Sequence, residues 1–151
     1  MKRLEWAPLL HTLSSLVVIA LSYWAGPRLA ISREAARSFG AAVFLLGMGL
    51  FAWVLAHLRR GFLGEVQPVT DYLVTTGPYR CVRHPLYLGM LIALTGIAIL
   101  FRSVSGLASA FLLFLPAAAC RAVLEERALA DEFGADWDHY AVRASFMLPG
   151  L

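Results

Sequence analysis

Four uncharged stretches, each near the length needed to cross a membrane, constrain the fold of this chain more than any other feature. They run from Trp6 to Pro27, from Ser38 to Leu58, from Pro85 to Phe101 and from Ser103 to Cys120. A helix needs roughly 20 apolar residues to cross a bilayer, with about 17 as the lower limit. The first two stretches are long enough. The last two are near the limit and separated only by Arg102, which predicts a tight helical hairpin.

The composition agrees with a chain that folds in lipid. Of its 151 residues, 60% are hydrophobic and only 15% are charged, whereas about a quarter are charged in soluble domains. We therefore predict an all-α integral membrane bundle of about four transmembrane helices with a cytoplasmic helical tail. The prediction is a single domain over residues 1–151, with the first two helices in 1–58, a cytoplasmic connector in 59–84, the hairpin in 85–120 and the tail in 121–151.

The first stretch is interpreted as a retained helix and not as a cleaved signal peptide. Lys2 and Arg3 provide a basic start, but Glu5 interrupts it. The apolar stretch is long, and no small-residue cleavage site follows Trp24.

The distribution of positive charge predicts an orientation in the membrane. Four helices place both termini on one side, together with nine basic residues: Lys2, Arg3, Arg59, Arg60, Arg80, Arg83, Arg121, Arg127 and Arg143. The opposite side has four, namely Arg28, Arg33, Arg37 and Arg102. The excess predicts cytoplasmic termini by the positive-inside rule. It also accounts for the net charge of +3, so no nucleic-acid partner is expected.

The two cysteines, Cys81 and Cys120, fall on the predicted cytoplasmic side. A disulfide is not expected in that compartment, and the pair lacks the spacing of a metal site. Both are interpreted as small packing residues.

A polar string, Gly77 to Gly89, directly precedes and enters the third stretch. It contains two arginines, a histidine, two tyrosines and two prolines. Polar groups at a membrane boundary are costly to bury unless they find partners. We therefore expect the string to hold a charged, nucleotide-like cofactor beside the lipid.

A second polar cluster is expected on the last helix, which should pass Pro116 with a kink and end before Gly134. Arg121 and Glu125 are four residues apart and share a face. Because the string lies on the same predicted side, we expect two sets of residues to converge: Tyr79, Arg83, His84 and Tyr87 with Arg121, Glu125 and Glu126.

This mixture of carboxylates, donors and aromatic rings suits a zwitterionic nucleoside better than a metal ion. A metal site would need several carboxylates or histidines at ligand spacing. The remaining histidines, His11, His57 and His139, are scattered along the chain. No metal is expected.

Structural roles are the alternative for several of these residues. Arg59 and Arg60 are interpreted as contacts to anionic lipid heads, worth about 1 kcal/mol each. Arg121 and Glu125 could form an ordinary helix ion pair worth roughly 0.2–0.5 kcal/mol. The tyrosines could be interfacial anchors. None of these explains the whole string together with the glutamate pair.

The string Gly77-Pro78-Tyr79-x-x-x-Arg83-His84-Pro85-x-Tyr87-x-Gly89 and the hairpin after it resemble the isoprenylcysteine carboxyl methyltransferase family of integral membrane enzymes. Phospholipid N-methyltransferases are more distantly similar. The resemblance continues through Arg121, Glu125-Glu126, Phe133-Gly134 and Tyr140, and covers roughly residues 67–149.

The resemblance implies use of S-adenosylmethionine without a Rossmann domain. Arg121 is the implied catalytic residue, facing the acceptor. The expected cofactor-binding residues are Gln67, Leu73, Val74, Tyr79, Arg83, His84, Pro85, Tyr87, Glu125, Glu126 and Tyr140. In charge terms, Glu125 suits the cofactor's ammonium or a ribose hydroxyl, and Arg83 or His84 suits its carboxylate.

The acceptor is expected to be a lipophilic small molecule or a lipid-modified substrate. Carboxyl O-methylation of an isoprenylcysteine-like molecule is favoured, since a carboxylate needs no general base. A phospholipid amine is the alternative. Two rival functions stay open: an NADPH-dependent membrane reductase resembling sterol reductases, which carry a similar Arg-His-Pro-x-Tyr string, and a non-catalytic membrane partner.

Overall fold

The computed structural model describes residues 6–24, 26–58 and 73–148, with side chains described from residue 9 onward. Within these ranges the regular structure is helical, which confirms the predicted all-α class. Four long helices are α1 (Trp6–Trp24), α2 (Arg33–Leu58), α3 (Pro85–Leu100) and α5 (Leu115–Phe133). Shorter elements are η2 (Gly77–Arg80), α4 (Val104–Ser109), η3 (Ala110–Phe114) and α6 (Ala135–Ala141).

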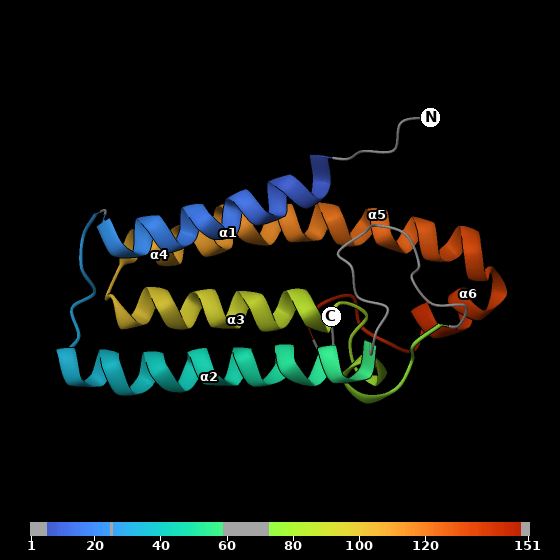
Figure 1. Cartoon of the computed structure of the whole chain (residues 1–151), viewed down its shortest axis with the longest axis horizontal. Helices are drawn as coiled ribbons and strands as arrows, with labels where there is room; N and C mark the ends of the chain where they lie inside the picture. The colour runs from blue at the N-terminus through green and yellow to red at the C-terminus, as the bar shows by residue number, and fades with distance from the viewer. Residues whose placement is uncertain (1–5, 25, 59–72, 149–151) are drawn as a thin grey trace.

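Helix α3 lies between α2 on one side and the pair formed by α1 and the α4–α5 helix on the other (Figure 1). Glycines allow α2 and α3 to approach closely. A Cβ atom added to Gly40 would lie 2.6 Å from the backbone nitrogen of Leu100, so no larger residue fits there without a shift. Close contact through small residues is the usual way in which helices associate inside a membrane.

The expected hairpin is present, with its turn at Phe101 to Ser103. Arg102 has a positive φ of 56°, and its Nη2 donates a hydrogen bond to the Leu29 carbonyl oxygen at 3.0 Å. Ser103 then caps α4 by accepting a bond from the Gly106 backbone N–H at 3.0 Å. The turn is thus tied both to the α1–α2 connection and to the next helix.

Elements α4, η3 and α5 follow one another without a break. Residues Ala110–Phe114 have π-helical hydrogen bonding just before Pro116, whose nitrogen carries no hydrogen. Such a local widening accommodates a proline without ending the helix. As expected, the helix then runs on to Phe133 and stops at Gly134, which has a φ of 51°.

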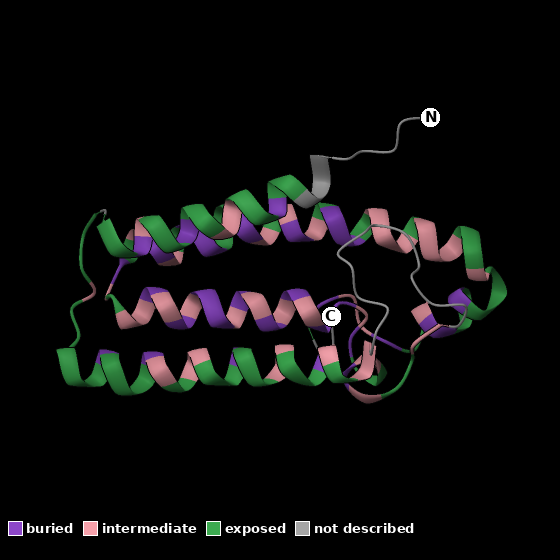
Figure 2. Ribbon diagram, in the orientation of Figure 1, coloured by how far each residue is buried: buried purple, intermediate pink, exposed green. Residues whose placement is uncertain are grey.

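Two helical stretches are long and apolar enough to cross a membrane, namely Arg33–Leu58 and Val104–Phe133. Two shorter apolar helices cover Leu9–Trp24 and Pro85–Leu100. Only 17% and 33% of the best windows in the long stretches are buried inside the protein. Figure 2 shows the exposed residues along the outside of the bundle. Apolar surface of this extent is unusual in a water-soluble monomer, so it supports a membrane helical protein. Four complete crossings stay a prediction.

The polar segments gather at one end of the bundle. The turn at Phe101–Ser103 lies at the opposite end, while η2, α6 and the last turns of α5 lie together (Figure 1). Ser145 joins the tail to the string, because its N–H donates to the Cys81 carbonyl oxygen at 3.1 Å and its own carbonyl accepts from Arg83 N–H at 2.8 Å.

The expectation for the cysteines is wrong. Cys81 and Cys120 are both free and exposed, so neither fills space in the core. Cys120 lies on an outward face of α5, which lipid can cover as readily as protein.

Candidate functional site

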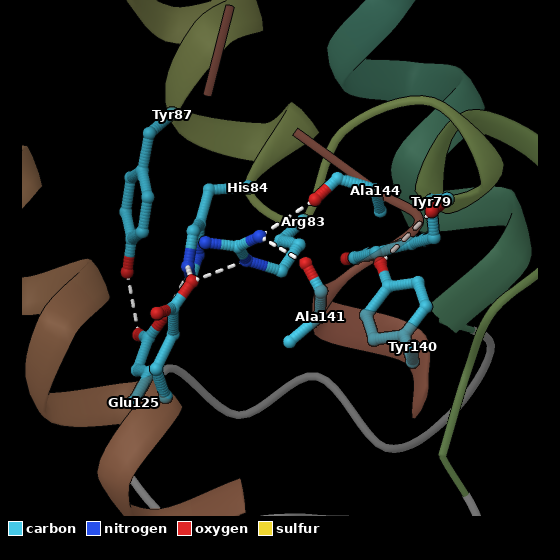
Figure 3. Close-up of polar contacts among 9 residues, drawn as sticks. Tyr79, Arg83, His84, Tyr87, Glu125, Tyr140, Ala141 and Ala144 are labelled. Atoms are coloured by element: carbon cyan, nitrogen blue, oxygen red, sulfur yellow. Dashed lines mark hydrogen bonds and ion pairs between the residues drawn. The ribbon is translucent and has the colours of Figure 1, made fainter. Parts of the chain in front are cut away.

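Helix α5 carries two consecutive glutamates that contact the polar string, and Figure 3 shows Glu125 facing Tyr87. Oε1 of Glu126 accepts a hydrogen bond from Arg83 Nε at 2.6 Å and lies 3.0 Å from His84 Nε2. Both partners come from residues more than forty positions earlier in the chain. This pair of contacts fixes α5 against the start of α3.

Glu125 is held by a different set of partners. Its Oε1 accepts from the Tyr87 hydroxyl at 2.5 Å and from Arg121 Nε at 3.0 Å. Its Oε2 lies 3.8 Å from His84 Nδ1, beyond hydrogen-bond distance. Oε1 of this carboxylate therefore accepts two hydrogen bonds from the protein, while the contact of Oε2 with His84 is not a hydrogen bond.

Local sequence explains why these side chains meet. Arg121 and Glu125 are one helical turn apart on α5. Pro85 is buried and occupies the first turn of α3, where its missing N–H costs nothing. Tyr87 follows in the same turn, so its ring stacks on His84 with centroids 5.9 Å apart. The Arg121 guanidinium carbon lies 6.0 Å from the centre of the Tyr87 ring.

Arg83 makes several contacts with protein groups. Besides Glu126, its Nη1 donates to the carbonyl oxygens of Ala141 at 2.7 Å and of Ala144 at 2.6 Å. Its guanidinium carbon also lies 5.7 Å from the centre of the Phe146 ring. These contacts favour a positioning role, in which Arg83 ties the tail to the glutamate pair. A direct contact with a cofactor stays a prediction.

Tyr79 and Tyr140 lie at the edge of this cluster. The Tyr140 hydroxyl donates to the Tyr79 carbonyl oxygen at 2.8 Å. Burial raises the pKa of the Tyr79 phenol, and the neighbouring Tyr140 and Glu125 act in the same direction. Burial also raises the pKa of Tyr140, against the opposing charge of Arg83. Both phenols therefore stay neutral donors over the physiological range.

Tyr140 also belongs to a small apolar cluster with Trp137 and Ala144, against which Leu73 packs. Because Trp137 and Tyr140 are only 6% and 8% exposed, they anchor the tail within the protein. Val74 is half-buried next to Leu73. Gln67 lies outside the described residues, so its predicted role is not addressed by the structure.

The predicted residues thus fall into two groups. Six of them form two hydrogen-bonded sets of three, which the 3.8 Å contact between His84 and Glu125 brings together and which are called the glutamate cluster below: Arg83, His84 and Glu126, and Tyr87, Arg121 and Glu125. The others with described positions take no part in these hydrogen bonds: Leu73, Val74, Tyr79, Pro85 and Tyr140. Their roles in binding or catalysis stay predictions.

Sequence reasoning missed His11. This residue of α1 is 6% exposed, and its ring centroid lies 5.1 Å from that of Tyr87 and 5.2 Å from that of Phe114. A signal for it was present in the sequence, since an ionisable side chain inside an apolar span is costly and usually has a function.

No group of three or more metal-ligating side chains is found within residues 6–24, 26–58 and 73–148. Within the described residues, Arg83 is ion-paired with Glu126 and Arg121 with Glu125.

Comparison with known proteins identifies the chain by family. Residues 35–136 match the family model described as phospholipid methyltransferase. The match includes the string, the hairpin and all six residues of the glutamate cluster, while α1 lies outside it. Among curated proteins, no match is found.

Proposed function

Because the chain belongs to the phospholipid methyltransferase family, we propose that this membrane methyltransferase takes its methyl group from S-adenosylmethionine and transfers it to a lipid-like acceptor. The observation that carries the proposal is the Glu125 carboxylate, which Tyr87 and Arg121 hold through one oxygen at the polar end of an apolar bundle. Such a group is suited to a cationic ligand beside the lipid.

The residues present fit the charges of this cofactor. S-adenosylmethionine carries a sulfonium, an ammonium and a carboxylate. Oε2 of Glu125 retains acceptor capacity for the ammonium or a ribose hydroxyl. His84 and the face of the half-buried Tyr79 would complete the site, because a neutral aromatic face can pack against adenine. When bound, the cofactor supplies an electrophilic methyl group on its sulfonium.

The chain's own contribution is alignment and exclusion of water. Tyr87 and Arg121 fix the Glu125 carboxylate, and the His84–Glu126–Arg83 contacts fix the segment that carries Tyr87. Holding two reactants in line lowers the barrier of a displacement reaction without any acid or base. The buried side of the cluster keeps water away from the reacting groups.

Arg121 is the proposed acceptor-facing residue. It is only 8% exposed, and it lies beside Glu125 and the Tyr87 ring. A buried guanidinium can orient a carboxylate through charge-assisted hydrogen bonds. We therefore keep carboxyl O-methylation of an isoprenylcysteine-like acceptor as the first candidate.

Phospholipid N-methylation is the second candidate, because the matched family is described by that class of substrate. The two candidate reactions differ in one proton, because an ammonium head group must lose a proton before its nitrogen can attack the methyl carbon. A carboxylate needs no such step.

The polar end of the bundle is proposed to face the cytoplasm. It carries the string and the C-terminal part of α5, including Arg80, Arg83, Arg121 and Arg127. Basic residues accumulate on the cytoplasmic side of membrane proteins. S-adenosylmethionine would then enter from that compartment, and the acceptor from the bilayer.

A binding measurement separates this proposal from its rivals. The full chain in lipid nanodiscs is titrated with S-adenosylmethionine and with NADPH by isothermal calorimetry. Saturable binding of S-adenosylmethionine alone supports the proposal. Binding of NADPH alone would indicate a reductase, and binding of neither would indicate a non-catalytic membrane protein.

A further inference from the structure

His11 is a buried ionisable residue that the proposed reaction leaves unused. Its side chain is 94% buried, and its Nε2 is the buried side-chain nitrogen or oxygen without a hydrogen-bond partner in the described part of the chain. Buried polar atoms in folded proteins are almost always hydrogen-bonded, so an exception indicates a missing partner.

The surroundings of His11 connect it to the glutamate cluster. Its ring lies edge-on to Tyr87 at 5.1 Å, and Tyr87 is the residue that donates to Glu125. Arg121 approaches the same Tyr87 ring at 6.0 Å and lies within electrostatic range of His11. His11 and Arg121 therefore reach the Tyr87 ring from two different helices, α1 and α5.

The charge at this point selects the kind of ligand. Arg121 acts electrostatically on His11, although its Nε is also bonded to Glu125, and its positive charge favours an anion over a second cation beside the His11 ring. An imidazole N–H can donate to such an anion without adding charge of its own.

We propose that His11 is a residue of the acceptor site, where its Nε2–H donates a hydrogen bond to an oxyanion oxygen of the acceptor's head group. The oxyanion is the carboxylate of an isoprenylcysteine-like molecule or the phosphodiester of a phospholipid. This inference rests on the proposed function. It places part of the acceptor recognition on α1, which the family match does not include.

The test uses the full chain in nanodiscs with two acceptor probes, S-farnesylcysteine and dioleoylphosphatidylethanolamine. His11→Phe keeps a ring and removes the nitrogens, while His11→Gln keeps an N–H donor. His139→Phe is the matched control, since His139 is exposed on α6. We expect His11→Phe to raise the KM of the probe that is methylated by about 10- to 100-fold, with partial recovery in His11→Gln. Binding of S-adenosylmethionine should be unchanged.

The two acceptor probes identify the source of the oxyanion. In His11→Phe, the KM rises for the probe whose oxyanion binds His11. An acceptor KM in His11→Phe equal to that of the unaltered protein would overturn the inference. So would weaker binding of S-adenosylmethionine with an unchanged acceptor KM, which would assign His11 to the cofactor.

A spectroscopic measurement on the unaltered protein covers the case in which His11→Phe does not fold. The unaltered protein is prepared with ¹⁵N-labelled histidine. The signal of the His11 ring nitrogens should shift when the probe that serves as methyl acceptor is added without cofactor. A probe that is methylated while this signal stays fixed overturns the inference and leaves the proposed function standing. A saturable shift without any methyl transfer supports the oxyanion site and counts against the proposed function.

Discussion

Tyr87 and Glu125 are 38 positions apart in the chain, and the phenol of the first donates a 2.5 Å hydrogen bond to the carboxylate of the second. This bond joins the first turn of α3 to the middle of α5. It also occupies Oε1 of Glu125, so the proposed cofactor contact is assigned to Oε2. The proposed cofactor site depends on that division.

Glu125→Gln tests the carboxylate itself. The amide has the same shape but no charge, so it cannot pair with an ammonium. We expect the Kd for S-adenosylmethionine to rise by about 10-fold or more, as for other hydrogen bonds to charged groups. Glu132→Gln, at an exposed position on the same helix, is the control. If both variants bind S-adenosylmethionine with the same Kd, Glu125 does not contact the cofactor.

Tyr87→Phe tests the hydrogen bond from the Tyr87 hydroxyl to Glu125. The variant keeps the ring that contacts His84 and His11 but loses the hydroxyl. We expect a loss of about 0.5–1.5 kcal/mol in the free energy of unfolding and a fall in kcat/KM, because Glu125 loses one of its two fixed donors. Tyr23→Phe, on the exposed side of α1, should change neither quantity.

Arg83→Lys tests the positioning role. A lysine is a single point charge and cannot reach Glu126, Ala141 and Ala144 at once. We expect a lower melting temperature and faster proteolysis after residue 134, since the tail loses its attachment. Arg80→Lys is the control at an exposed position. A variant with normal stability but weaker S-adenosylmethionine binding would instead show that Arg83 contacts the cofactor.

Tyr140→Phe gives a pH-dependent prediction. At neutral pH the variant should lose about 0.5–1.5 kcal/mol, because the bond to the Tyr79 carbonyl is gone. Burial raises the pKa of Tyr140 in the folded state, so above about pH 10 only the unfolded chain ionises there. The unaltered protein should therefore lose stability with rising pH faster than the variant. Denaturant unfolding of the unaltered protein and of Tyr140→Phe, from neutral pH to above about pH 10, checks whether the difference in their free energies of unfolding narrows.

Much of the site could be predicted from the sequence because its signals are local. Pro85 marks the first turn of α3, Gly134 marks the end of α5, and four-residue spacing places Arg121 beside Glu125. These features depend on backbone rules that act over a few residues.

The parts that could not be predicted depend on contacts between distant segments. Nothing local to Arg83 indicates that its guanidinium binds the carbonyl oxygens of Ala141 and Ala144, about 60 positions later. His11 reads in the sequence as a scattered histidine, and only the packing of α1 against α3 and η3 brings it to Tyr87 and Phe114. The exposure of Cys120 likewise follows from which face of α5 turns outward, and that of Cys81 from the turn after η2.

Transfer of a labelled methyl group tests the central claim most directly. The full chain is incubated with methyl-labelled S-adenosylmethionine and a membrane lipid extract supplemented with a prenylated cysteine, and the labelled product is identified by mass. We predict a labelled lipophilic product that the Glu125→Gln variant does not form. A base-labile product would be a methyl ester, and a base-stable one an N-methylated lipid. The account is contradicted if folded protein, supplied with both acceptors, forms no labelled lipophilic product.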